Sequence, residues 1–266
     1  FVEKRGLDVK RKVLSWLLTF SLILGLWPTA ALAADDVAAL TEKTVSVSNW
    51  ADLKASVAAL TDDEYLRADI TAPLTADSEL DIDGKVVVLS ATAGDISITR
   101  TLQSEANSTN PIFKLTNNAS LSISGTENGI TLLDSTERKK SRGLIEADSG
   151  TTLNLSNVSF RDFKFGYTLA GSGYGAIYAV NATIAMQNVA MSNCIGDNGV
   201  LIYAKNSKVS MNECAVANTT YWGNSNSIGG VIQIEGTNSD VTMTNCKIEG
   251  CGSAEENGAA NSVGPV

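Results

Sequence analysis

Aromatic side chains are concentrated in two segments rich in small and polar residues, 162–174 and 218–228. With two nearby residues predicted to face outward, they give the candidate ligand-binding residues Phe165, Tyr167, Tyr174, Tyr178, Tyr221, Trp222 and Gln233. Aromatic rings beside Asn, Ser and Gln suit the binding of a sugar ring or a peptide. The alternative is that these rings fold down over the flank of the molecule and only bury it.

Catalysis has few candidate residues. The chain contains no histidine, which removes the commonest general base and metal ligand. Cleavage of a glycan would need paired carboxylates, or carboxylates that hold Ca²⁺ beside an arginine base. The outward positions predicted for one set of strands are Lys114, Glu146, Tyr178, Ile202 and Gln233, and they include a single carboxylate. The sequence therefore supplies no catalytic residue, and we expect no metal site and no cofactor.

A repeated pattern must position the candidate residues. Four copies of it begin at Gly143, Gly175, Gly199 and Gly230, and four aligned positions are apolar in every copy. These positions are Ile145, Ile177, Leu201 and Ile232; Leu155, Met186, Met211 and Met243; Val158, Val189, Cys214 and Cys246; and Phe160, Met191, Val216 and Ile248. A unit of this size cannot enclose its own apolar face, so the copies must stack on one another.

Each copy holds three short runs in which apolar and polar residues alternate, which is the period of a β-strand. Three strands per copy predict an all-β solenoid, a parallel β-helix in which each turn lies roughly 4.8 Å above the last. Asn157, Asn188 and Asn245 then share one corner, with Glu213 as the exception, because asparagine tolerates left-handed dihedral angles. An antiparallel sandwich with coincidental repetition is the alternative.

The copies beginning at Gly143, Gly175 and Gly199 are 32, 24 and 31 residues long. The extra length falls after the third strand, in the two aromatic segments. Because the turn between them has almost no loop, we predict a notch two turns wide, roughly 10 Å. Its floor would include Tyr178, Ile202 and Gln233.

The first 33 residues have the three parts of a secretory signal peptide. Basic residues 10–12 precede an apolar run over residues 13–26, and the small-residue sequence Ala31–Leu32–Ala33 follows. We expect cleavage after Ala33, and secretion or display at the cell surface. An uncleaved membrane anchor is the alternative.

After this signal peptide, residues 34–44 are expected to form a spacer and residues 45–266 to form one β-helix domain. The chain begins with Phe1 rather than methionine, and it stops at Val266 just after a new turn would begin. We therefore expect a fragment of a longer protein, truncated at its C-terminus.

An amphipathic helix is predicted at the start of the domain. Asn49 is a good N-cap, and Trp50, Leu53, Val57 and Leu60 recur at helical spacing on one face. This helix would cover the open end of the stack, which could otherwise pair with other strands. Binding of a partner helix is the alternative use.

The net charge limits the partners. It is −9 for the whole chain, and removal of residues 1–33, with five basic and two acidic residues, changes it to −12. A chain this acidic repels phosphate backbones, so we expect no nucleic-acid partner. The expected partners are a glycan or a host or cell-surface protein, with membrane contact only through the signal peptide or an anchor outside this chain.

The four cysteines fall in the last three copies. Cys214 and Cys246 share an inward position on adjacent turns, whereas Cys194 and Cys251 share another position two turns apart. The separations, roughly 4.8 and 9.6 Å, exceed the preferred Cβ separation of a disulfide. We expect four thiols, and the absence of histidine and of a Cys-x-x-Cys pair argues against a zinc site.

Two kinds of segment carry a resemblance to known proteins. The segments 229–232 (Gly-Gly-Val-Ile) and 175–178 (Gly-Ala-Ile-Tyr) are similar to a Gly-Gly-Ala-Ile motif, and Met-Asn-Glu-Cys at 211–214 and Met-Thr-Asn-Cys at 243–246 accompany them. In these features the chain resembles bacterial surface proteins of the adhesin-like and polymorphic outer membrane protein families. The resemblance implies a right-handed, single-stranded parallel β-helix with a binding or display role. Pectate-lyase-like enzymes share this fold, so a polysaccharide lyase or glycoside hydrolase is the alternative function.

Overall fold

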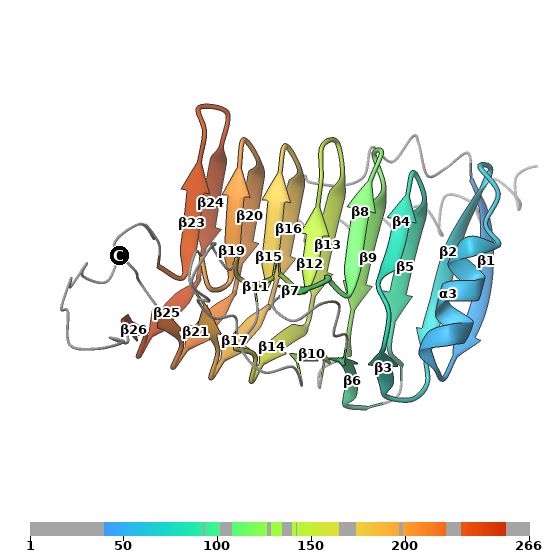
Figure 1. Ribbon diagram of the computed structural model, residues 1–266, viewed down its shortest axis with the longest axis horizontal. Helices are drawn as coiled ribbons and strands as arrows, with labels where there is room; N and C mark the ends of the chain where they lie inside the picture. The colour runs from blue at the N-terminus through green and yellow to red at the C-terminus, as the bar shows by residue number, and fades with distance from the viewer. Residues whose placement is uncertain are drawn as a thin grey trace, which may run out of the picture.

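The described chain is a stack of parallel β-strands (Figure 1). The computed structural model describes residues 40–92, 94–101, 108–126, 129–134, 140–141, 143–164, 174–196, 199–221 and 230–253. Within these residues the longer strands form three sheets, named sheets A, B and C, and neighbouring strands in each sheet are parallel. This arrangement is compatible with a parallel β-helix and excludes the antiparallel sandwich.

The strands of each sheet follow one another along the stack in chain order. Sheet A consists of β1 (Thr41–Val47), β2 (Glu64–Ile70), β5 (Val86–Ser90), β9 (Ser120–Ser124), β13 (Thr152–Ser156), β16 (Thr183–Gln187), β20 (Lys208–Asn212) and β24 (Asp240–Thr244). Sheet B consists of β3 (Leu74–Ala76), β6 (Ile96–Arg100), β10 (Ile130–Asp134), β14 (Val158–Arg161), β17 (Ala190–Ser192), β21 (Ala215–Ala217) and β25 (Lys247–Glu249). Sheet C consists of β4 (Leu80–Asp83), β8 (Phe113–Thr116), β12 (Ile145–Ala147), β15 (Ile177–Val180), β19 (Ile202–Lys205) and β23 (Ile232–Glu235).

Two groups of two-residue strands follow strands of sheet B in the chain. They are β7 (Ser108–Thr109) with β11 (Lys140–Ser141), and β18 (Ile195–Gly196) with β22 (Thr220–Tyr221) and β26 (Gly252–Ser253). One rung is therefore a strand of sheet C, then of sheet A, then of sheet B, followed by a connection to the next rung. Strand β1 begins inside the segment that was predicted to be a spacer.

Equivalent residues of successive rungs form columns, as the repeat predicts. Leu155, Met186, Met211 and Met243 are paired in register across sheet A. Phe160, Met191, Val216 and Ile248 form the matching column in sheet B. Up to the rung before the last one described, these side chains are buried, so the core is a narrow stack of apolar side chains. The columns are confirmed, apart from one slip in sheet C that is described below.

Helix α3 (Trp50–Ala58) lies at the β1 end of the stack (Figure 1). Asn49 begins it as predicted, since its side-chain oxygen accepts the backbone N–H of Asp52 at 2.9 Å. Trp50, Leu53 and Val57 are buried toward the core, and the Trp50 ring meets Phe113 edge to face with centroids 5.7 Å apart. The predicted apolar face of the helix is thus the face that packs.

The corners of the rungs are built from residues in the left-handed conformation. The first corner, between the strands of sheets C and A, has positive φ at Asn181 and Asn206. The second corner, between sheets A and B, has it at Asn157, Asn188, Glu213 and Asn245, and the third, after sheet B, at Asp162, Asn193 and Asn218. At the second corner, Nδ2 of Asn188 donates to Oδ1 of Asn157 at 2.6 Å, and Nδ2 of Asn157 donates to the Gly125 carbonyl at 3.1 Å. The predicted asparagine column is confirmed, together with its exception at Glu213, which has φ 54°.

Replacing Glu213 by asparagine is expected to raise the free energy of unfolding by about 1 kcal/mol, because asparagine tolerates left-handed dihedral angles that glutamate adopts at a cost. The substitution also removes the exposed hydrogen bond that Gln187 donates to the Glu213 carboxylate at 2.8 Å, which contributes little. Urea unfolding measures the change. Asn188→Ala serves as the opposite control, since alanine at φ 50° should lower the stability. A Glu213→Asn protein no more stable than the parent would contradict the prediction.

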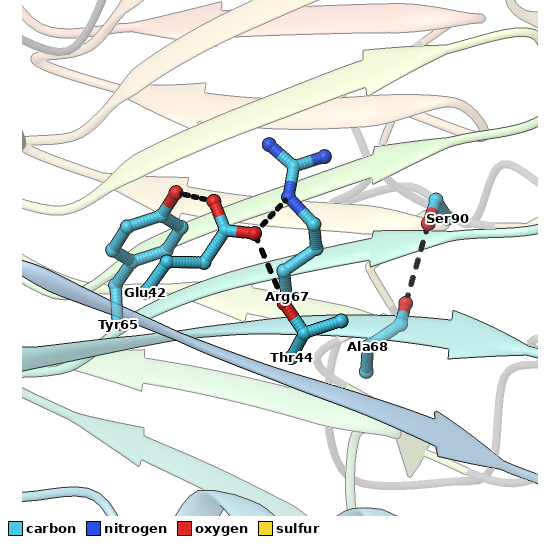
Figure 2. Close-up of polar contacts among 6 residues, drawn as sticks. All are labelled: Glu42, Thr44, Tyr65, Arg67, Ala68 and Ser90. Atoms are coloured by element: carbon cyan, nitrogen blue, oxygen red, sulfur yellow. Dashed lines mark hydrogen bonds and ion pairs between the residues drawn. The ribbon is translucent and has the colours of Figure 1, made fainter.

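The first two strands of sheet A are joined by a polar cluster around Glu42 (Figure 2). The Glu42 carboxylate accepts hydrogen bonds from the Tyr65 hydroxyl and from Thr44 Oγ1, and it pairs with Arg67 Nε at 3.1 Å. The bond from Tyr65 is the main reason that the pKa of Glu42 lies below its usual range. The contacts with Tyr65 and Arg67 help to hold β1 on β2. Because β1 is an edge strand, its charged side chains also disfavour pairing with another chain.

A buried ion pair lies in the core of sheet B. Arg100 and Asp134 occupy paired positions on β6 and β10, and they follow Ile98 and Leu132 on the inward face. Arg100 Nη2 lies 2.5 Å from Asp134 Oδ2, and both side chains are fully buried. Arg100 Nη1 also donates to the carbonyls of Asn110 and Gly143, each at 3.1 Å. The pair therefore ties sheet B to the backbone that leads into β8 and β12.

The four cysteines lie in the predicted columns. Cys214 and Cys246 are adjacent, since Lys247 N donates to the Cys214 carbonyl at 2.8 Å. Cys194 and Cys251 are two rungs apart with Thr219 between them, and Thr219 donates to Cys251 Sγ at 3.1 Å. All four are free thiols. Burial raises the pKa of Cys194 to about 12 and that of Cys214 to about 11, so both are held in the protonated form.

Candidate binding face on sheet C

The outer face of sheet C carries one continuous column of polar and aromatic side chains. Alternation along each strand turns one set of residues into the core and the other set outward. The outward column, in order along the stack, is Asp81, Lys114, Glu146, Tyr178, Tyr203 and Gln233. Charged groups therefore occupy the β4 end of this face, and the tyrosines of β15 and β19 followed by Gln233 occupy the β23 end.

The position of Tyr203 corrects the sequence alignment by one residue. Ile202, not Leu201, pairs with Ile177 and Ile232, so Ile202 faces the core and Tyr203 faces outward. The slip arose because Val200, Leu201 and Ile202 are three consecutive buried residues, which conceal the alternation. A usable signal was present. The sequence Ile-Tyr-Ala occurs at 177–179 and at 202–204. In both places an asparagine with positive φ follows four residues after the isoleucine.

Three tyrosines form the centre of the face. The rings of Tyr178 and Tyr203 are stacked with centroids 5.3 Å apart and planes 4° from parallel. Tyr174 packs against both, with centroids 4.5 Å from Tyr178 and 4.7 Å from Tyr203. Tyr203 is the buried member at 6% exposure, whereas Tyr174 and Tyr178 remain partly exposed. The cluster thus buries one ring and presents parts of two others to solvent.

Glu235 fixes the polar groups beside the tyrosines. It accepts a hydrogen bond from the Tyr203 hydroxyl at 2.6 Å and another from Gln233 Nε2 at 2.8 Å. Burial, and then the hydrogen bond to Glu235, raise the pKa of Tyr203 well above its usual value. Tyr203 is therefore a neutral donor throughout the physiological pH range. Sequence reasoning missed Tyr203 because the slip placed Ile202 in its position, and it did not single out Glu235, which lies two residues after the predicted Gln233 on the same face of β23.

The β4 end of the face holds a mixed group of charges. Lys114 Nζ lies 3.9 Å from Glu79 Oε1, and Asp81 and Glu146 flank Lys114 in the outward column. Partial burial raises the pKa of Glu79, and the charges of Asp81 and Glu146 add to this shift while Lys114 opposes it. The column therefore contains a second carboxylate, Asp81, which the sequence analysis did not assign to it.

The structure brings together three of the predicted ligand-binding residues, Tyr174, Tyr178 and Gln233. Tyr221 lies in β22, between β18 and β26, and its side chain is not among the described ones. Phe165, Tyr167 and Trp222 lie outside the described residues. The walls of the predicted notch are therefore still a prediction. At the position predicted for its floor, the outward residues are Tyr178, Tyr203 and Gln233, and Ile202 faces the core instead.

No family model matches the chain, and no curated protein is similar to it in sequence. The function must therefore be inferred from this face. No helix in the described part of the chain is long and apolar enough to cross a membrane. Within the same residues, no group of three or more His, Cys, Asp or Glu side chains is placed to hold a metal ion. What the face offers chemically is exposed aromatic surface, an amide, hydroxyls and fixed carboxylates.

Proposed function

We propose that this protein is an exported, adhesin-like or display protein of the cell surface, built as a right-handed, single-stranded parallel β-helix with α3 as its N-terminal cap. Three all-parallel sheets with short connections support the architecture, because parallel crossovers are right-handed in almost all proteins. The secretory pattern of residues 1–33 supports export, although it lies outside the described residues. The proposed role is binding without catalysis.

The tyrosine cluster of sheet C is the observation that carries the binding role. Tyr174 and Tyr178 expose aromatic surface, and Gln233 and Glu235 supply fixed hydrogen-bonding groups on a neighbouring part of the same face. Sugars are recognised by this combination, since the apolar face of the ring stacks on an aromatic side chain while its hydroxyls bond to amides and carboxylates. We therefore propose a glycan as the ligand of this face.

Replacing Tyr178 by alanine is expected to weaken glycan binding by about tenfold or more, the usual effect of losing a central aromatic contact. A glycan array with the full chain identifies a binding sugar, and calorimetry then compares the variants. Tyr178→Phe retains the ring and should bind nearly as well as the parent.

Tyr65→Ala is the matched control, because Tyr65 is also an outward tyrosine but lies on β2 of sheet A. Its binding should equal that of the parent. Equal affinity of the Tyr178→Ala and parent proteins would reject the proposed face.

A glycoside hydrolase is the second candidate function, favoured by one observation. Asp81 and Glu146 flank Lys114, and Glu79 beside them has a raised pKa, which is a property of general acids. Release of reducing ends from neutral and acidic polysaccharides, with and without Ca²⁺, measures this activity. An activity that Glu79→Gln and Glu146→Gln abolish would establish the hydrolase, whereas no release from any polysaccharide would leave the binding role.

A further inference from the structure

The outer face of sheet C carries an excess of negative charge. Its six strands point four acidic side chains outward, and only two basic ones. These are Asp81, Asp83, Glu146 and Glu235 against Lys114 and Lys205. Glu79, just before β4, adds a further carboxylate 3.9 Å from Lys114 Nζ. The face therefore attracts cations, in agreement with the net charge of −9 of the whole chain.

The carboxylate of Glu235 lies at the hydroxyl end of the tyrosine cluster. It accepts hydrogen bonds from Tyr203 at 2.6 Å and from Gln233 Nε2 at 2.8 Å, and both donors are neutral groups. Lys205 is its neighbour across the strand pair, but among the described residues no ion pair joins the two. The negative charge of Glu235 is therefore held in position without being neutralised by a bonded cation.

The aromatic rings beside this carboxylate favour the same sign of ligand charge. The π-electrons of tyrosine make the face of the ring negative, so that it attracts an ammonium group. Tyr178 stacks on Tyr203, and Tyr174 packs against both at tilts of 53° and 55°. Because Tyr174 and Tyr178 are partly exposed, aromatic surface and a fixed carboxylate occur side by side on this face.

We propose that the glycan recognised by this face is an amino sugar with an unsubstituted ammonium group, such as a glucosamine oligomer. This inference rests on the proposed glycan-binding role and specifies the class of sugar. The sugar ring packs on the exposed parts of Tyr174 and Tyr178, and its ammonium group donates to the Glu235 carboxylate. Hydrogen bonds between charged groups are about twice as strong as those between neutral groups.

The same charges act against other ligands. A uronic acid or a sulfated sugar would bring negative charge to a face that is already negative. An N-acetylated sugar keeps the ring and loses the ammonium group, so it retains the stacking contact and loses the attraction to Glu235. A lysine-rich peptide carries ammonium groups, but it offers no ring whose apolar face can cover Tyr174 and Tyr178 together.

Two oligosaccharides of equal length and linkage test the proposal, one of glucosamine and one of N-acetylglucosamine. Calorimetry with the full chain at low salt should show the glucosamine oligomer binding about tenfold more tightly. Raising the salt concentration to about 0.5 M should remove most of this difference, because exposed charges are then screened. The affinity for the acetylated oligomer should change little.

Two carboxylate variants locate the charge that is responsible. Glu235→Gln keeps an oxygen that can accept from Tyr203 and Gln233, but it removes the negative charge. It should weaken binding of the glucosamine oligomer by about fivefold and leave binding of the acetylated oligomer unchanged. Glu213→Gln removes an equal charge from an exposed corner between sheets A and B, and it should leave both affinities unchanged.

Three results would overturn the inference. The first is a neutral or acidic glycan that binds as tightly as the glucosamine oligomer. The second is an equal effect of Glu235→Gln and Glu213→Gln, and the third is a lysine-rich peptide that binds more tightly than either oligomer. The proposed function itself fails by a different result, a parent protein that binds no glycan at all.

Discussion

Replacing Asp134 by alanine is expected to lower the free energy of unfolding by about 3–5 kcal/mol, the usual cost of removing one partner from a buried ion pair. The variant leaves the Arg100 guanidinium fully buried, 2.5 Å from where its carboxylate partner had been. The hydrogen bonds from Arg100 to the carbonyls of Asn110 and Gly143 supply dipoles but no negative charge. Urea unfolding of both proteins gives the difference.

Two controls distinguish a buried-charge effect from a general weakening of packing. Arg100→Met combined with Asp134→Leu removes both charges and should recover most of the missing stability, since apolar residues of similar volume often replace a buried pair at little cost. Asp62→Ala removes an exposed ion pair, the one with Lys85 at 3.0 Å, and should change the stability by less than about 1 kcal/mol. If Asp134→Ala cost no more than Asp62→Ala, the pair would not contribute to the stability of the core.

Replacing Gly175 by alanine is expected to destabilise the protein by about 3 kcal/mol, at the upper end of overpacking effects. A Cβ on Gly175 would lie 1.7 Å from the carbonyl oxygen of Gly199 and 2.5 Å from that of Val200. Both are backbone atoms of the next rung, so they can move only if the rungs separate. Separation would strain the neighbouring hydrogen bond from Ala176 N to the Val200 carbonyl, now 2.9 Å long.

Gly230→Ala is the matched control for this prediction. Gly230 lies at the equivalent position two copies later, but a Cβ there meets nothing within 4 Å in the described part of the chain. The expected change is within about 0.5 kcal/mol, as for most open surface sites. Thermal unfolding of the two variants measures the contrast, and equal effects would show that the close approach of the rungs at Gly175 is not what requires glycine. Because Gly175 lies between Tyr174 and Tyr178, the Gly175→Ala protein should also lose glycan binding.

The repeat predicted most of the scaffold because each prediction depended on local chemistry. Alternation placed Met186 and Met211 in one inward column, and asparagine at the corners marked the residues with left-handed dihedral angles. The helix begins after Asn49 for an equally local reason, the bond from its side chain to the backbone of Asp52. Such features need only neighbours in the chain or the next copy of the same pattern.

The candidate site was only partly predictable. The run from Val200 to Ile202 is apolar throughout, so alternation could not decide which of its residues faces outward, and Tyr203 was missed. Counting back from the left-handed Asn206 would have resolved this, because corners fix the register where strands do not. The packing of Tyr174 on Tyr203 could not be obtained in the same way, since the two residues belong to different rungs and Tyr174 precedes its strand.

The amino-acid sequence alone determined the strand period, the stacking of like residues, the corner residues, the helix start and the columns of the cysteines. The tertiary structure alone decided that Arg100 of β6 pairs with Asp134 of β10 in the core, that Asp81 joins the outward column of sheet C, and that the final described rung exposes Ile248. The physical reason is the range of the interactions. A periodic pattern specifies the features that every rung shares. Contacts that occur in one place only depend on how the connecting segments position neighbouring rungs, and the local preferences of the residues do not encode that positioning.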